Sequence, residues 1–190
     1  MLRKTAKAVL GLLLKDYAYY TIFERTRQDA PPRVRAPADR AFVEVGVEEL
    51  ARAADAGIRG TAGYCGPQCA VFACRDAAEI VGVCVYWWNP RYRERNFWPL
   101  ADDEAKLVEL LVIPSLRGRG IASTLIAHSA DAMLARGFRR LYARVWHSHV
   151  ASRRSFLAAG WAPICNVVDV LPRGAGRRWR MERRVAQRTE

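Results

Sequence analysis

Hydrophobic and polar residues follow two different periods along this chain. The first thirty residues place apolar side chains at steps of three and four, which predicts an amphipathic helix: Leu2, Ala6, Val9, Leu10, Leu13, Tyr17 and Tyr20. Prolines and charges without any period follow at residues 30–37 and predict a linker. We therefore expect a helix and linker at residues 1–37, ahead of a domain at residues 38–190.

The rest of the chain alternates between strand and helix patterns. Two runs rich in β-branched residues, 69–74 and 80–88, flank a short polar turn and predict a β-hairpin. Further strands are expected at 41–45, 105–113, 140–146, 161–171 and 177–185, with helices at 47–56, 119–135 and 151–159. This order predicts a mixed α/β domain with a largely antiparallel central sheet flanked by helices.

A strand, a glycine turn and a helix follow one another between Leu110 and Ala122. The N–H groups at a helix start lack partners, and the helix dipole adds about half a positive charge there, so such a turn suits a phosphate. The Walker A pattern does not fit, because Ile121 and Ala122 replace its Lys-Ser/Thr pair, and Ser123 replaces the third glycine of the dinucleotide pattern. A plain strand-to-helix turn is the alternative.

Two motifs resemble one known superfamily. The residues Arg117-Gly118-Arg119-Gly120-Ile121-Ala122 resemble the R/Q-x-x-G-x-G/A loop of the GCN5-related N-acetyltransferase (GNAT) superfamily. The stretch from Ser152 to Trp161 resembles the second motif of that superfamily, N-x-x-A-x-x-x-Y-x-x-x-G-F. The resemblance implies a GNAT fold, here with the N-terminal helical extension, and it implies transfer of an acyl group from acetyl-CoA or another acyl-CoA.

The resemblance also implies a cofactor site between the fourth and fifth strands of the fold. The main chain of Leu110–Val112 would pair with the pantetheine arm, and the amides of Gly118–Ser123 would hold the pyrophosphate. The full set that the resemblance implies is Leu110, Leu111, Val112, Arg117, Gly118, Arg119, Gly120, Ile121, Ala122, Ser123, His149 and Phe156.

Two positions depart from the family pattern. His149 falls where the usual Asn contacts the pantetheine arm, and a histidine can donate a similar hydrogen bond. Phe156 falls where many relatives have the tyrosine that protonates the thiolate leaving group. Because Phe156 has no proton to give, that role is empty or belongs to water or another residue. A catalytically weak module that only binds acyl-CoA or a polyanion is therefore the alternative to an enzyme.

Direct acyl transfer also needs a group that removes a proton from the amine. Glu109 is the first candidate, because a charge inside the apolar run 107–111 is costly unless it faces a cleft or a partner. Glu104 and His147 are the next candidates, and each has a plain surface or ion-paired role as the alternative. His147 and His149 lack an apparent third ligand, so no metal site is expected.

The charge of the chain bears on its partners. Lys and Arg number 31 against 19 Asp and Glu, which gives a net charge of +12. Basic and aromatic residues mix at 91–98, and arginines gather at 173–184, which favours an anionic acceptor or surface. We expect a small-molecule amine as acceptor, with an anionic group as one option, and no sequence-specific nucleic-acid binding. A basic N-terminal helix resting on an anionic membrane is an alternative.

Five cysteines, Cys65, Cys69, Cys74, Cys84 and Cys165, show no C-x-x-C pattern. Reduced thiols in a cytoplasmic protein are expected, with a Cys65–Cys69 disulfide as the alternative.

Overall fold

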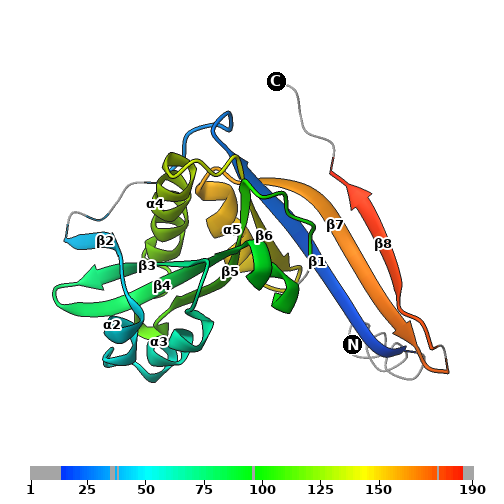
Figure 1. Ribbon diagram of the computed structural model, residues 1–190, viewed down its shortest axis with the longest axis horizontal. Coiled ribbons are helices and arrows are strands. Elements are labelled where there is room, and N and C mark those ends of the chain that lie inside the picture. The colour runs from blue at the N-terminus through cyan, green and yellow to red at the C-terminus, as the bar shows by residue number, and fades with distance from the viewer. Residues whose placement is uncertain (1–13, 35–36, 38, 96, 175, 186–190) are drawn as a thin grey trace.

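The computed structural model describes residues 14–34, 37, 39–95, 97–174 and 176–185. Within this part of the chain, eight strands form one sheet in the order β2-β3-β4-β5-β6-β1-β7-β8 (Figure 1). The strands are β1 (Leu14–Thr26), β2 (Arg40–Glu44), β3 (Cys69–Asp76), β4 (Glu79–Trp88), β5 (Glu104–Val112), β6 (Arg140–Trp146), β7 (Ala162–Pro172) and β8 (Trp179–Arg184). The helices are α2 (Val47–Ala51), α3 (Ala56–Gly60), α4 (Ile121–Ala135) and α5 (Val150–Ala158), with short 3-10 turns η1 (Thr61–Tyr64), η2 (Asn89–Arg95) and η3 (Pro114–Leu116).

The sheet confirms the predicted mixed and largely antiparallel architecture. All neighbouring strands run antiparallel except β5 and β6, which run parallel. The predicted hairpin is β3 and β4, whose register pairs Phe72 with Cys84. From β2 to β8, the strands and the two long helices lie close to where the pattern predicts them, whereas the glycine-rich stretch after residue 56 contains α3 and η1.

Helices cover both faces of the sheet. On one face α4 and α5 bury a core that includes Phe23, Leu107, Leu125, Ala143 and Phe156 (Figure 1). On the other face α2 and α3 pack near β3 and β4, around residues such as Leu50, Ile58 and Val85. That second face continues over β6, β1 and β7 as a separate cluster that contains Tyr20, Ile22, Phe97, Tyr142 and Cys165.

The expected N-terminal helix is wrong for residues 14–26, which form the long strand β1. This strand lies between β6 and β7, and Tyr20 pairs with Trp146 on one side and Val167 on the other. The residues from Tyr20 to Phe23 are all buried, because both faces of the strand are covered there. A short, continuous apolar run of aromatic and β-branched residues fits a buried strand, and spacing alone cannot distinguish it from a helix.

The correction removes residues 14–26 from the amphipathic helix on which the alternative of membrane contact rested. The remainder of the expected helix, residues 1–13, lies outside the described residues. Within the described part of the chain, no helix has the length and apolar character needed to cross a membrane.

Candidate functional site

The sheet opens between its two parallel strands. Strands β5 and β6 pair from Glu104 and Arg140 up to Leu107 and Ala143, and both strands continue beyond that last pair. On the other side of β5, the register with β4 shifts between Val85 and Tyr86, because β5 holds an extra residue there. Such a bulge bends a strand and is common beside active sites. Two hollows lie at this opening.

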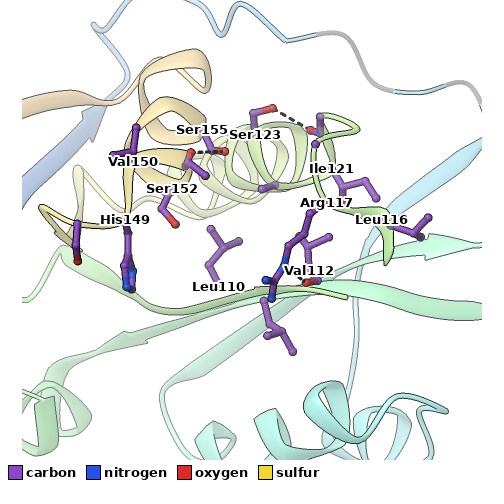
Figure 2. A pocket seen from close by; sticks show the side chains of 16 residues that line it. Leu110, Val112, Leu116, Arg117, Ile121, Ser123, His149, Val150, Ser152 and Ser155 are labelled. Carbon is purple, nitrogen blue, oxygen red and sulfur yellow. Dashed lines mark hydrogen bonds between the residues drawn. The ribbon is translucent and has the colours of Figure 1, made fainter. Parts of the chain in front are cut away.

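The first hollow, here called the helix-side hollow, lies between the end of β5 and the helices α4 and α5 (Figure 2). Figure 2 shows Leu110 and Val112 on the strand below, with Ser123 and Ser155 on the helices above. The hollow has a volume of about 590 Å³. Its lining consists mainly of small and apolar residues together with exposed main chain, so it suits a long, flexible ligand more than a compact charged one.

The turn before α4 shapes one end of the helix-side hollow. Gly118 and Gly120 have φ angles of +78° and +79°, a region that favours glycine, and Gly120 is the N-cap of α4. A Cβ added at either glycine would meet no atom within 4 Å, so the turn faces open space. Because the glycine N-cap offers no side-chain oxygen, the first amides of α4 have no side-chain cap, which leaves them suited to an anion. The side chain of Arg117 folds back, and its Nε donates to the carbonyl oxygen of Val112 at 3.1 Å.

The second hollow, here called the aromatic hollow, opens beside β5 and β6. It has a volume of about 470 Å³ and a more polar lining. Its walls combine aromatic, charged and aliphatic side chains: Phe97, Leu107, Val108, Glu109, Leu110, Ala143, Arg144, Val145, Trp146, His149, Ser152 and Phe156. A carboxylate and a guanidinium thus line one cavity, which gives it the means to bind a polar ligand.

The two hollows meet at three residues. Leu110, His149 and Ser152 line both of them. In Figure 2, Ser152 lies in the space between His149 and Leu110. His149 is the N-cap of α5 and its amide donates to the carbonyl oxygen of Trp146 at 2.9 Å. A ligand in each hollow would therefore approach the other across this junction.

Most of the residues that the resemblance implies for the cofactor line the helix-side hollow. They are Leu110, Leu111, Val112, Arg117, Gly118, Gly120, Ile121, Ala122, Ser123 and His149. Arg119 is exposed at the turn but does not line the hollow. Phe156 lines the aromatic hollow instead, where it is 3% exposed and packs against the rings of Phe23 and Trp161.

The three candidate bases lie in different places. Glu109 lines the aromatic hollow. Glu104 lies at the closed end of the parallel pair, where its carboxylate accepts from the Ala101 amide at 2.9 Å and lies 3.6 Å from Arg139. His147 lines neither hollow, because its ring stacks on Tyr19 with centroids 4.1 Å apart. Among the described residues, no group of three or more His, Cys, Asp or Glu side chains could hold a metal ion.

For the aromatic hollow, the sequence indicates Phe97, as part of the acceptor segment 91–98, but not Arg144, Trp146 or the neighbouring Tyr20. Phe97, Arg144 and Trp146 line it, and Tyr20 of β1 contacts the guanidinium of Arg144. Burial raises the pKa of Tyr20 to about 12, and the neighbouring Asp169 adds to the shift against the effect of Arg180. The alternation in the predicted strand 140–146 was the one available signal, because it puts Arg144 and Trp146 on the same face.

A comparison of the whole sequence with protein families identifies the family of the chain. The family model described as the acetyltransferase (GNAT) family matches residues 24–161. The chain belongs to the GNAT family. The match includes both motifs and the strands on either side of the opening. No curated protein matches the chain in sequence.

Solved GNAT structures share this fold. A GNAT-family acetyltransferase from Colwellia psychrerythraea superposes with a TM-score of 0.59 at 14% identity, over 87% of this chain and 60% of that one. A GCN5-related N-acetyltransferase from Sphaerobacter thermophilus gives a TM-score of 0.58 at 17% identity, over 97% and 58%. A tandem GNAT protein from the clavulanic acid biosynthesis pathway gives 0.56 at 13% identity, over 92% and 59%. This chain thus spans about 60% of the length of the structures that it matches.

Proposed function

We propose that this chain is an acyl-CoA-dependent N-acyltransferase that moves an acetyl group from acetyl-CoA to a primary amine of a small molecule, by direct transfer in a ternary complex. The observation that carries this proposal is the junction of two hollows at Leu110, His149 and Ser152. A donor in the helix-side hollow and an acceptor in the aromatic hollow would meet there. Membership of the GNAT family supports the acyl donor.

The helix-side hollow suits the donor. The main chain of Leu110–Val112 would hydrogen-bond the pantetheine arm, as an added strand would, and the amides from Gly118 to Ser123 would hold the pyrophosphate. The open space at Gly118 and Gly120 gives the phosphates room to approach the main chain. Arg117 and Arg119 would add positive charge beside them, and His149 would take the place of the usual asparagine.

Acetyl-CoA supplies the activated acyl group, and the chain positions it and moves protons. In the reaction the amine nitrogen bonds to the carbonyl carbon, the carbon–sulfur bond breaks, and the electron pair leaves with sulfur. Glu109 would accept the proton that the amine loses, directly or through a water molecule, since it lines the acceptor-side hollow. Glu104 and His147 fit this role less well, because neither lines a hollow.

The departing thiolate needs a proton, and Phe156 cannot supply one. Of the side chains at the junction, Ser152 and His149 carry groups that can donate. Ser152 lies on the first turn of α5, within the hollow in which the pantetheine arm would lie. We assign to the hydroxyl of Ser152 a hydrogen bond to the departing sulfur; CoA would leave as the thiolate and take its proton from water.

The test combines cofactor binding with turnover. Calorimetry with CoA and a free-thiol assay with acetyl-CoA and a panel of primary amines should show binding and amine-dependent thiol release. Gly120→Glu places a carboxylate where the pyrophosphate would bind, so CoA binding should fall at least about 100-fold. Gly174→Glu is the matched control, because Gly174 has a φ of +81°, also faces open space and lies in neither hollow.

Two results would contradict the proposal. Unchanged CoA affinity in Gly120→Glu would remove the cofactor assignment. Normal CoA binding without thiol release for any amine would instead support the alternative of a binding module, which the absence of a hydroxyl at Phe156 favours.

A further inference from the structure

Arg144 gives the aromatic hollow a fixed positive charge. It lies one residue beyond Ala143, the last residue of β6 that pairs with β5, and it lines the hollow. Its guanidinium carbon is 5.4 Å from the ring centroid of Tyr20, 5.2 Å from that of Phe97 and 5.1 Å from that of Trp146. Contacts with ring faces hold an arginine in place, and the guanidinium stays charged at any pH at which proteins fold.

Distant parts of the chain brace these rings. The hydroxyl of Tyr20 donates to Asp169 on β7 at 3.1 Å. Arg180 on β8 donates to the carbonyl oxygen of Phe97 at 3.1 Å. Tyr20 and Phe97 are only 2% and 4% exposed. The position of Arg144 is therefore set before any ligand binds, which lowers the entropy lost when it pairs with one.

The hollow thus contains charges of both signs. Glu109 lines it from β5 and Arg144 lines it from β6, on the two strands that separate. An amine suits the carboxylate, whereas the planar edge of a guanidinium pairs with the two oxygens of a carboxylate or phosphate. Three aromatic rings contact the guanidinium, whose fork of N–H groups matches the geometry of a planar anion.

We infer that the acceptor carries a carboxylate or phosphate group in addition to its amine, and that Arg144 is the residue that selects it. The inference rests on the proposed function and names the class of its second substrate. The amine would point to the junction at His149 and Ser152, and the anion would lie against Arg144. The net charge of +12 would attract such an acceptor to the protein.

The test uses reaction products, so it does not depend on turnover. Calorimetry with saturating CoA compares N-acetyl amino acids that have small, aromatic or acidic side chains with their neutral amides. N-acetyl-2-aminoethylphosphonate represents the phosphate class. The best anionic product should bind at least about tenfold more tightly than its neutral partner, as expected for a charge-assisted pair. The member with the highest affinity distinguishes a carboxylate acceptor from a phosphorylated one.

Variants of Arg144 and Arg140, which both lie on β6, test whether Arg144 causes the preference for the anionic product. Arg144→Gln should abolish the preference for the anion, and Arg144→Lys should keep part of it because the charge remains without the fork. Arg140→Gln is the matched control, since Arg140 lies on the same face of β6, outside the aromatic hollow and 3.8 Å from Glu24. CoA affinity within about twofold of wild type would show that each variant folds.

Equal binding of acids and amides by the wild type would overturn the inference, as would an unchanged preference in Arg144→Gln or no binding of any anionic product. Failure of the wild type to bind CoA would instead contradict the proposed function. In that event the same products, tested without CoA, still decide the role of Arg144.

Discussion

The two hollows beside the open end of the β5–β6 pair are lined by different kinds of residues. The helix-side hollow is lined mostly by glycine, alanine, serine and aliphatic residues of two contiguous segments, 110–123 and 148–155. The aromatic hollow and the cage around its arginine take side chains from β1, from the segment before β5, from β5 and β6, and from α5. A ligand common to a whole family can be held by main chain, whereas a ligand particular to one protein requires side chains. Substitutions should therefore affect the two hollows differently.

The largest expected effect is at Glu109 in the aromatic hollow. Glu109→Gln should lower kcat by about 100-fold or more, because a positioned general base contributes that much, and it should leave CoA affinity unchanged. Steady-state kinetics and calorimetry measure the two effects. Glu104→Gln is the comparison on the same strand: it removes one of the two carboxylates that face Arg139, and it should lower thermal stability while kcat changes little. A fall in kcat only for Glu104→Gln would reverse the assignment of the base.

Ser152 lies where the hollows meet, and its removal should have the next largest effect. Ser152→Ala should lower kcat about tenfold with the KM for acetyl-CoA nearly unchanged, because the lost hydrogen bond would form as sulfur becomes charged. Ser152→Thr retains a hydroxyl and should recover part of the rate. Equal rates for the alanine and threonine variants would show that the hydroxyl has no role in the reaction.

Substitution of Arg117 tests how much of the acyl-CoA binding in the helix-side hollow comes from the main chain and how much from side chains. Its side chain is exposed, so Arg117→Gln should weaken CoA binding only by about three- to fivefold, since water and salt screen an exposed charge. Titrations at low and high salt should show the difference between variant and wild type shrinking as salt rises. A loss as large as that expected for Gly120→Glu would mean that side chains hold the donor as well, and the contrast between the hollows would fail.

The smallest effect concerns Tyr20 behind the aromatic hollow. Tyr20→Phe removes the hydrogen bond to Asp169 and should lower the free energy of unfolding by about 1 kcal/mol at neutral pH. The folded pKa of about 12 exceeds the usual value of 10.0, so between these values the unfolded chain binds fewer protons than the folded one. Stability from this group is thus complete below pH 10 and is lost as pH rises toward 12.

Denaturant unfolding at pH 8 and pH 10.5 measures that loss. Tyr20→Phe lacks the titrating group, so its stability should fall less between the two pH values than that of the wild type. The same decrease in both proteins would place the titration in other groups, such as Tyr86 and Tyr142, whose pKa values burial also raises.

The same contrast explains what could be predicted from the sequence. The turn at Gly118 and Gly120 could be predicted because a strand end, two glycines and a helix start are adjacent in the chain, and local signals are enough to place them. Arg144 looks like an ordinary strand residue until Tyr20 and Phe97 lie against it. The error at residues 14–26 has the same origin, because only pairing with β6 and β7 makes that segment a strand.

The position of β1 between β6 and β7 also affects the order in which the strands pair during folding. The strand is synthesised before any other described part of the chain, yet its partners are among the last, and Tyr20 and Asp169 are 149 residues apart. Closing so long a loop costs entropy before the contacts of β1 with β6 and β7 can stabilise it. The strand should therefore join the sheet late and slowly. Until β1 joins the sheet, every molecule exposes the same two unpaired strand edges, one on β6 and one on β7, and each can pair with β1 of another molecule. Refolding at high concentration should therefore produce dimers in which two copies exchange β1, a species that dilution before refolding would suppress.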